Sequence, residues 1–426
     1  MQKNKTQIVV ISLFLMSLIC FGHISAQNNL NTPYSGLGIG DVKTDILHPY
    51  NNSLGGLSQT LRNDNMLNPF NPASYTAIKM NSFVFDMGFS GEIARMKTNS
   101  VQGNTEGTAN ISHIYFGFPI IEKYKMSFGL MPYSNTNYIS TNTAEDPVYG
   151  RIKRVYEGFG GINQIYWGHG VQIAKNLSVG ANVNFLFGTV HNMSSSEFLD
   201  SAYTHFFNPC IDKSTSVADL SGSVGVQYQL PVKETHLFSF GLTYDIPAKF
   251  KASYSEFMYS YKSSSFDSSF YEESQRDIKL PQSINAGIAY EKINKWMVGV
   301  DVKYTNWDNH LFLGESPDNK TDNFYTALGG ELKGNLSSIK YWNRISWRGG
   351  VHFENAKYVI NNNNIDDIGF HLGASFPMRK SRSAFNISFM YGILGTTSND
   401  LIKKDYMKIG VSFSAGDRWF VRRKYD

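Results

Sequence analysis

The sequence has little charge. Charged residues occupy 17% of its 426 positions, whereas about 25% is usual in soluble domains. The formal net charge of +4 falls to +2 without Lys3 and Lys5, because residues 1–26 contain no Asp or Glu. This near-neutral balance excludes a nucleic-acid binder that works by charge, so no nucleic acid is expected among the partners.

A long apolar run is also missing after residue 26, where nothing approaches the roughly 20 residues of a membrane helix. Residues 1–26 themselves have the pattern of a secretory signal peptide. Lys3 and Lys5 precede the apolar stretch 8–21, and Ala26 is a small residue suited to cleavage. The exported chain would keep one cysteine, Cys210, which excludes an intramolecular disulfide.

Signals for catalysis are equally poor. The chain lacks a Gly-x-Ser-x-Gly nucleophile elbow and a His-x-x-x-His pair suited to zinc. The glycine-rich stretch 36–40 is not followed by the Lys-Ser/Thr of a phosphate-binding loop. The acidic stretch 316–323 lacks the spacing of an EF-hand, which favours a solvated loop. We therefore predict no enzymatic activity, no metal site and no cofactor.

From residue 81 onward, apolar residues alternate with small or polar ones. Phe83, Phe85, Met87 and Phe89 alternate with Val84, Asp86, Gly88 and Ser90, and similar runs begin near residues 177, 238, 296, 368 and 407. A period of two predicts strands with one apolar and one polar face. Many of these runs have nine to eleven residues, the length of a tilted membrane-spanning strand.

These features predict an all-β protein, an antiparallel transmembrane β-barrel of about 14 strands over residues 81–426. A secreted β-sandwich or propeller is the alternative, but it would have shorter strands and a more charged surface. The stretches at 123–125, 174–176 and 292–294 are predicted as periplasmic turns, and 134–146, 308–340 and 361–367 as outer loops. One strand is expected over 343–353.

Residues 27–80 lack the alternation and are rich in Asn, Gly and Pro. They carry too many apolar residues for a solvated tail, among them Leu54, Leu57, Leu67 and Tyr75. We predict that they form an N-terminal hatch, or plug, inside the barrel.

The hatch-like stretch 55–75 ends in Asn71-Pro72-Ala73-Ser74-Tyr75 and precedes the strand pattern directly. With the late pair of strands at 280–307, it resembles the FadL family of outer-membrane channels for long-chain fatty acids and other hydrophobic compounds. The opening "NTPYSGLGIGD" and the stretch 158–188 resemble a Bacteroidetes-type branch of that family. By itself, Asn71-Pro72-Ala73 is equally typical of an ordinary Asn-Pro turn.

The resemblance implies a passive channel in the outer membrane of a Gram-negative cell, with membrane lipid and a hydrophobic ligand as partners. In the family, ligands leave sideways through a gap at a kinked third strand. On our count this strand is 125–138, and Pro132 within it would weaken strand pairing or simply end the strand.

Arg344, Arg348 and His352 fall on one face of the predicted strand 343–353. Lumen-facing arginines could bind the carboxylate of a fatty acid, although pairing with acidic residues of the plug is the more common arrangement.

A second hypothesis belongs to another class. FadL-like barrels also serve in the type IX protein-secretion machinery of Bacteroidetes, so this chain could be a partner subunit that binds a secretion-translocon protein. The stretches 190–216 and 308–340 would then be partner-binding loops.

Overall fold

The structure is a computed structural model that describes residues 31–42, 48–203, 205–262, 265–307, 311–313, 322–360, 362–379 and 381–418. The predicted signal peptide, the residues 419–426 and most of the acidic stretch 316–323 lie outside the described residues. Within the described ranges, no helix is both long enough and apolar enough to cross a membrane.

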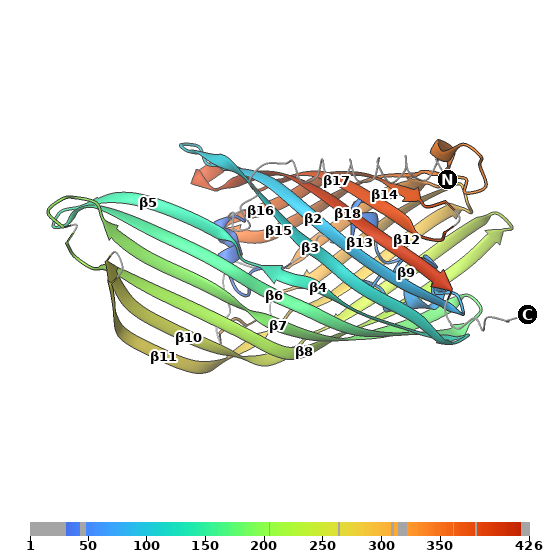
Figure 1. The fold of residues 1–426 in the computed structure, drawn as a ribbon, viewed down its shortest axis with the longest axis horizontal. Coiled ribbons are helices and arrows are strands. Elements are labelled where there is room, and N and C mark those ends of the chain that lie inside the picture. The colour runs from blue at the N-terminus through green and yellow to red at the C-terminus, as the bar shows by residue number, and fades with distance from the viewer. Residues whose placement is uncertain are drawn as a thin grey trace, which may run out of the picture.

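A ring of 14 antiparallel strands forms the body of the molecule (Figure 1). Its strands are β2 (Ser82–Lys97), β3 (Gln102–Ile121), β4 (Tyr124–Asn135), β6 (Gly150–Ala174), β7 (Leu177–Phe198), β8 (Asn208–Lys233), β9 (His236–Ile246), β12 (Gln282–Lys292), β13 (Trp296–Asn306), β14 (Asn323–Leu332), β15 (Ser346–Ile360), β16 (Asn363–Pro377), β17 (Ala384–Leu394) and β18 (Lys403–Arg418). The last strand closes the ring on the first, from Lys403 opposite Lys97 to Arg418 opposite Ser82. The predicted closed barrel and its number of strands are confirmed.

Side chains alternate between the two faces of the wall as predicted. In β2, Phe89 and Ile93 are exposed on the outside, while Val84 and Asp86 are fully buried on the inside. Exposed apolar side chains on every ring strand form the outer surface that faces lipid. Apart from one stretch between β3 and β4, neighbouring strands pair around the ring, so most backbone polar groups need no water in the hydrocarbon layer.

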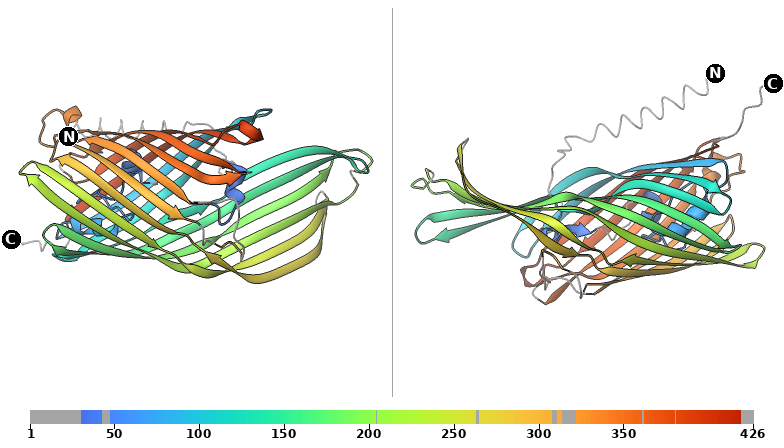
Figure 2. Two further views of the ribbon diagram at one scale, coloured as in Figure 1. Left: turned by 180° about the vertical axis from the view of Figure 1, so that it is seen from behind. Right: turned by 90° about the horizontal axis from the view of Figure 1, so that it is seen from below.

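Three ring strands continue far beyond the ring and form a projecting sheet. β6, β7 and β8 have 25, 22 and 26 residues, and a 25-residue strand is about 80 Å long. Their outer halves pair with β5 (Tyr138–Asp146) on one side and with β10 (Lys249–Lys262) on the other, and β11 (Ser265–Lys279) pairs with β10. This projecting sheet extends well past the other strands in Figure 1 and is seen nearly edge-on at the right of Figure 2.

The N-terminal residues contribute short elements: η1 (Pro33–Gly36), β1 (Asp41–Val42), α2 (Pro49–Asn52) and η2 (Pro72–Ala77). Two more 3₁₀ turns, η3 (Tyr341–Arg344) and η4 (Ser398–Asp400), lie in connections between strands. α2 packs against β16, β17 and β18, and η2 against β4, β6, β7 and β8. Because these walls lie on opposite sides of the ring, the segment between them crosses its interior (Figure 1).

Several predicted loops are instead strands. Residues 138–146 form β5, and β14 lies within the stretch predicted as the loop 308–340. The stretch 190–216 consists mostly of the outer parts of β7 and β8, and the stretch 361–367 is a tight turn at Asn362 followed by β16. For 138–146 and 190–216, polar composition suggested loops because the projecting sheet is solvated on both faces and lacks the alternation of a membrane strand.

A lipid-facing substitution tests the orientation of the wall. Ile288, in the middle of β12, is 43% exposed on the outer face. Ile288→Arg is expected to destabilise the protein in lipid vesicles, lowering its free energy of unfolding by about 2–4 kcal/mol, whereas Ile288→Leu should change that free energy little. Urea titrations followed by gel mobility would measure this, and equal stability of both variants would contradict the assigned orientation.

Candidate functional site

The apolar residues of the N-terminal segment are buried inside the ring. Leu54 and Leu57 have no exposed surface, and they belong to one cluster with Met297, Tyr325 and other residues of the wall. Burying a leucine stabilises by about 1.5–3 kcal/mol. We call residues 48–78 the lumen segment.

Glycines on the inner wall allow the lumen segment to lie directly against the strands. A Cβ atom added at Gly241 or Gly287 would lie within 3.0 Å of Gln59, and one added at Gly329 within 3.0 Å of Leu54. The same holds for further glycines on other strands; together these positions form a glycine belt, made of Gly180, Gly225, Gly241, Gly287, Gly329 and Gly350. Any larger residue there would push the segment away from the wall.

Asn71-Pro72-Ala73 lies at one end of this contact. The Asn71 Oδ1 atom accepts a hydrogen bond from the Ala73 N–H (3.1 Å), and Pro72 begins η2, which is the turn that the sequence allows. The Asn71 Nδ2 atom also donates to the Gln59 carbonyl (2.9 Å) and to the Val226 carbonyl of β8 (3.3 Å). The turn is therefore both a local structure and a buried contact with the wall.

Asp301 of β13 holds the middle of the lumen segment. Its Oδ2 atom accepts hydrogen bonds from the backbone N–H groups of Ser58 (2.7 Å) and Gln59 (2.9 Å), and only 2% of the residue is exposed. On the other side, the Gln227 Nε2 atom donates to the Gln59 carbonyl (2.7 Å). Charged acceptors make such hydrogen bonds strong, so they fix the backbone here.

Arg62 links the lumen segment to the wall near the end of the ring at which β2 begins. Its Nη1 atom donates to the Thr76 Oγ1 atom (2.8 Å) and to the Ser178 Oγ atom of β7 (3.1 Å). Burial lowers the pKa of Arg62 to about 10, so the guanidinium remains charged at neutral pH.

A fully buried His–Asp–His group joins the start of the lumen segment to the wall. Asp86 of β2 lies 2.9 Å from the His48 Nε2 atom and 3.1 Å from the His113 Nε2 atom of β3. The Tyr50 N–H donates to the His48 Nδ1 atom (3.1 Å), so the proton of this ring is on Nε2 and points to Asp86. The same proton occupies the lone pair that a metal ion would need, and the group therefore fits a hydrogen-bonded anchor better than a metal site.

The three predicted carboxylate contacts do not lie together. Arg348 and His352 are buried on the inner face of β15, but Arg344 lies in η3, before the strand begins at Ser346, and donates to the Leu336 carbonyl. The prediction of one shared face is wrong for Arg344, because β15 begins at Ser346 and not at residue 343, where the alternation placed the start of the strand.

Protein groups already surround the other two candidates. The Arg348 Nη1 atom lies 3.3 Å from the Glu331 Oε1 atom, and its Nε atom donates to the Ser53 Oγ atom (2.6 Å). The His352 Nδ1 atom lies 2.7 Å from the His371 Nε2 atom. This is the pairing with acidic and plug residues that we gave as the alternative.

The wall opens between β3 and β4. Their pairing runs from Ile121–Tyr124 up to Ile114–Leu130 and ends there, although both strands continue. β3 changes register at Ser112, and β4 changes register between Pro132 and Ser134. Bulges of this kind bend strands and end pairing, so Pro132 lies where the two strands separate.

A cavity of about 630 Å³ lies at this gap. Lumen-facing Ser90 and Lys408 line it, and so do Ile111, Asn163 and Ile409, which are exposed on the outer face of the wall. The cavity therefore reaches from the interior of the barrel to its lipid-facing surface. β1 covers part of the β4 edge, with Val42 opposite Ser134.

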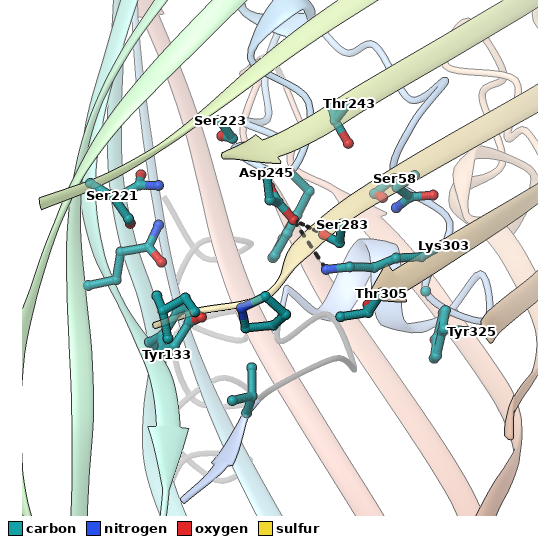
Figure 3. A pocket seen from close by; sticks show the side chains of 18 of the residues that line it. Ser58, Tyr133, Ser221, Ser223, Thr243, Asp245, Ser283, Lys303, Thr305 and Tyr325 are labelled. Carbon is teal, nitrogen blue, oxygen red and sulfur yellow. Dashed lines mark hydrogen bonds and ion pairs between the residues drawn. The ribbon is translucent and has the colours of Figure 1, made fainter. Parts of the chain in front are cut away.

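A second cavity, of about 190 Å³, lies between the lumen segment and β8, β9, β12 and β13 (Figure 3). Most of the side chains labelled there carry hydroxyl or charged groups. The Lys303 Nζ atom lies 3.4 Å from the Asp245 Oδ2 atom, and the Ser283 hydroxyl also donates to that carboxylate. Apolar side chains such as Phe70, Met131 and Leu280 complete the lining, so this part of the lumen has a mixed character.

Comparison with protein families identifies the family of the chain. A single family model, BamG, matches residues 5–426. The chain belongs to the BamG family. No curated protein matches the sequence of this BamG-family chain.

Solved structures share the fold at low sequence identity. A Pseudomonas aeruginosa FadL homologue is 12% identical with a TM-score of 0.58, over 86% of this chain and 96% of that one. The P. putida toluene transporter TodX is 13% identical with a TM-score of 0.57, over 90% of this chain and 99% of that one. The Ralstonia pickettii toluene transporter TbuX is 13% identical with a TM-score of 0.55, over 86% of this chain and 97% of that one. The predicted resemblance to FadL proteins is confirmed as one of fold, and the BamG-family chain shares the closed barrel of these outer-membrane proteins.

Sequence reasoning missed most of the residues that hold the lumen segment in this BamG-family protein. Asp86 was visible only as a polar member of an alternating strand, Asp301 only as part of the FadL-like stretch 280–307, and His48 and His113 are 65 positions apart. The available signal was an Asp at an inward position of an otherwise small or apolar face, where a buried charge needs a partner.

The Asp301 anchor can be tested. Asp301→Leu leaves the buried N–H groups of Ser58 and Gln59 without an acceptor, which costs about 1–3 kcal/mol for each. We expect faster proteolysis within residues 55–65 of the detergent-solubilised protein. Asp301→Asn retains one oxygen acceptor and should be much less sensitive, and equal protease resistance of the two variants would contradict the anchor.

Proposed function

We propose that this protein is a non-enzymatic channel for the passive uptake of hydrophobic molecules, such as long-chain fatty acids, across the outer membrane. One observation carries the proposal: strand pairing between β3 and β4 stops at Ile114–Leu130, and a cavity joins the lumen to the lipid-facing surface at that place. Moving sideways into lipid lowers the free energy of a hydrophobic molecule, so such a route requires no energy source and no cofactor.

The lumen segment supports this lateral route. In our proposal residues 27–80 act as a hatch, and the buried Asn71-Pro72-Ala73 turn and the Asp301 hydrogen bonds keep the central passage closed. Ligand would enter from the side of the projecting sheet and leave through the gap. Toluene transporters and a FadL homologue with the same fold are consistent with this class of cargo.

Filling the gap should block uptake. Thr108 and Asn110 of β3 line the gap cavity, and an indole at either position would occupy much of it. We expect Asn110→Trp to reduce uptake of a radiolabelled fatty acid by cells at least tenfold, while Asn142→Trp on the exposed part of β5 should not change it. Normal uptake in a correctly folded Asn110→Trp protein would overturn the lateral route.

A second candidate function is that of a partner subunit in an outer-membrane machine such as the type IX secretion system. The projecting sheet favours it, because a simple channel needs no six-stranded sheet beyond the membrane. β11 is exposed on both faces over Ser265–Glu273, including Phe266 (69%) and Tyr271 (60%). Exposed edge strands of this length commonly pair with, or are covered by, another chain.

Removing the tip of the projecting sheet would separate the two functions. Replacing residues 257–271 by a short turn leaves every ring strand intact. If the protein is a partner subunit, the shortened protein should lose a co-purifying outer-membrane protein and impair secretion, with hydrophobic uptake unchanged. Unaltered secretion and an unaltered set of co-purifying proteins would exclude this candidate.

A further inference from the structure

The gap cavity has a chemical character that hydrocarbon transport does not require. Only four of its lining side chains are apolar: Ile111, Pro132, Phe187 and Ile409. Most of the others are neutral amides and hydroxyls from β2, β3, β4, β6, β7, β17 and the N-terminal residues, among them Thr108, Asn110, Ser112, Asn135, Asn163 and Thr189. An opening towards lipid that served only alkyl chains would be lined by apolar groups.

The charges at this cavity are paired. Glu92 and Lys408 are its two charged lining residues, and the Lys408 Nζ atom lies 3.7 Å from the Glu92 Oε2 atom. The Lys404 Nζ atom also contacts the Glu92 Oε1 atom (2.6 Å). Because two lysines hold Glu92, an anionic headgroup would have to displace this carboxylate and lose its own hydration, which costs free energy.

The free edge of β3 adds hydrogen-bonding groups. Over residues 102–113, β3 pairs with β2 along one edge, and no strand of the described residues pairs with its other edge. Backbone N–H and C=O groups on such an edge are available to a ligand. Side chains and backbone thus offer donors and acceptors together, at the boundary between the lumen and the lipid.

From these observations we infer that the gap binds amphiphiles that combine a long acyl chain with an uncharged headgroup rich in hydroxyl groups. The headgroup lies among the Asn, Ser and Thr side chains, and the acyl chain leaves past Ile111 and Ile409. This inference rests on the proposed channel function and refines its cargo, because it favours a monoacylglycerol over a free fatty acid or an alkane.

The test is equilibrium binding to the full-length mature protein in phosphatidylcholine nanodiscs, with empty nanodiscs as background. The probes are radiolabelled 1-monooleoylglycerol, oleate and hexadecane. We expect saturable binding of 1-monooleoylglycerol, about tenfold tighter than that of oleate, since two or three hydrogen bonds to the headgroup account for such a ratio.

Two variants assign the binding to the gap. Asn110 and Asn163 are both exposed, so Asn110→Leu and Asn163→Leu should fold normally and weaken binding of 1-monooleoylglycerol about tenfold, leaving oleate and hexadecane unaffected. Asn142→Leu, on exposed β5, is the matched control and should bind like the original protein.

The outcomes are distinguishable. Saturable binding of oleate or hexadecane at least as tight as that of 1-monooleoylglycerol would overturn the headgroup inference and leave the channel proposal standing. Saturable binding of none of the three probes would overturn both. Preference for 1-monooleoylglycerol that survives both Asn variants would place the site elsewhere and overturn the assignment to the gap.

Discussion

The close approach of the lumen segment to the barrel wall is the constraint on which the rest of the structure depends. Backbone atoms of residues 54–72 touch the wall where the glycine belt removes every Cβ atom. Glycine in a strand costs about 0.5–1 kcal/mol in conformational entropy. Burial of leucines such as Leu54 and Leu57, and the hydrogen bonds to Asp301, offset that cost. The result is a lumen segment held directly against several strands of the wall.

The gap between β3 and β4 lies beside residues that hold the lumen segment. His113 is next to the bulge at Ser112, where β3 leaves β4, and it shares Asp86 with His48 of the lumen segment. The His48–Asp86–His113 group thus lies next to the point at which β3 and β4 separate. A rigid, fully paired wall beneath and two separated strands above give an opening that does not require the whole barrel to deform.

The projecting sheet is continuous with the ring. β6, β7 and β8 cross the membrane and continue without interruption, so any force or contact at the outer tip reaches the ring through continuous strands. Channel and partner functions use different parts of the molecule, and a shared fold therefore does not decide between them. The BamG-family chain has both the gap and the large exposed sheet.

The sequence by itself determined most ring strands, their two faces and the closed barrel of 14 strands, because a period of two and a span of about ten residues are local properties of the chain. It also identified residues 27–80 as a segment apart, from their missing alternation. It did not determine β5, β14 or the projecting sheet. The tertiary structure alone decided which polar residues meet: Asp301 with Ser58, Asp86 with His48 and His113, and Arg348 with Glu331. Such meetings depend on strand register and on the path of the lumen segment, and a shift of one residue would turn each of these side chains to the opposite face.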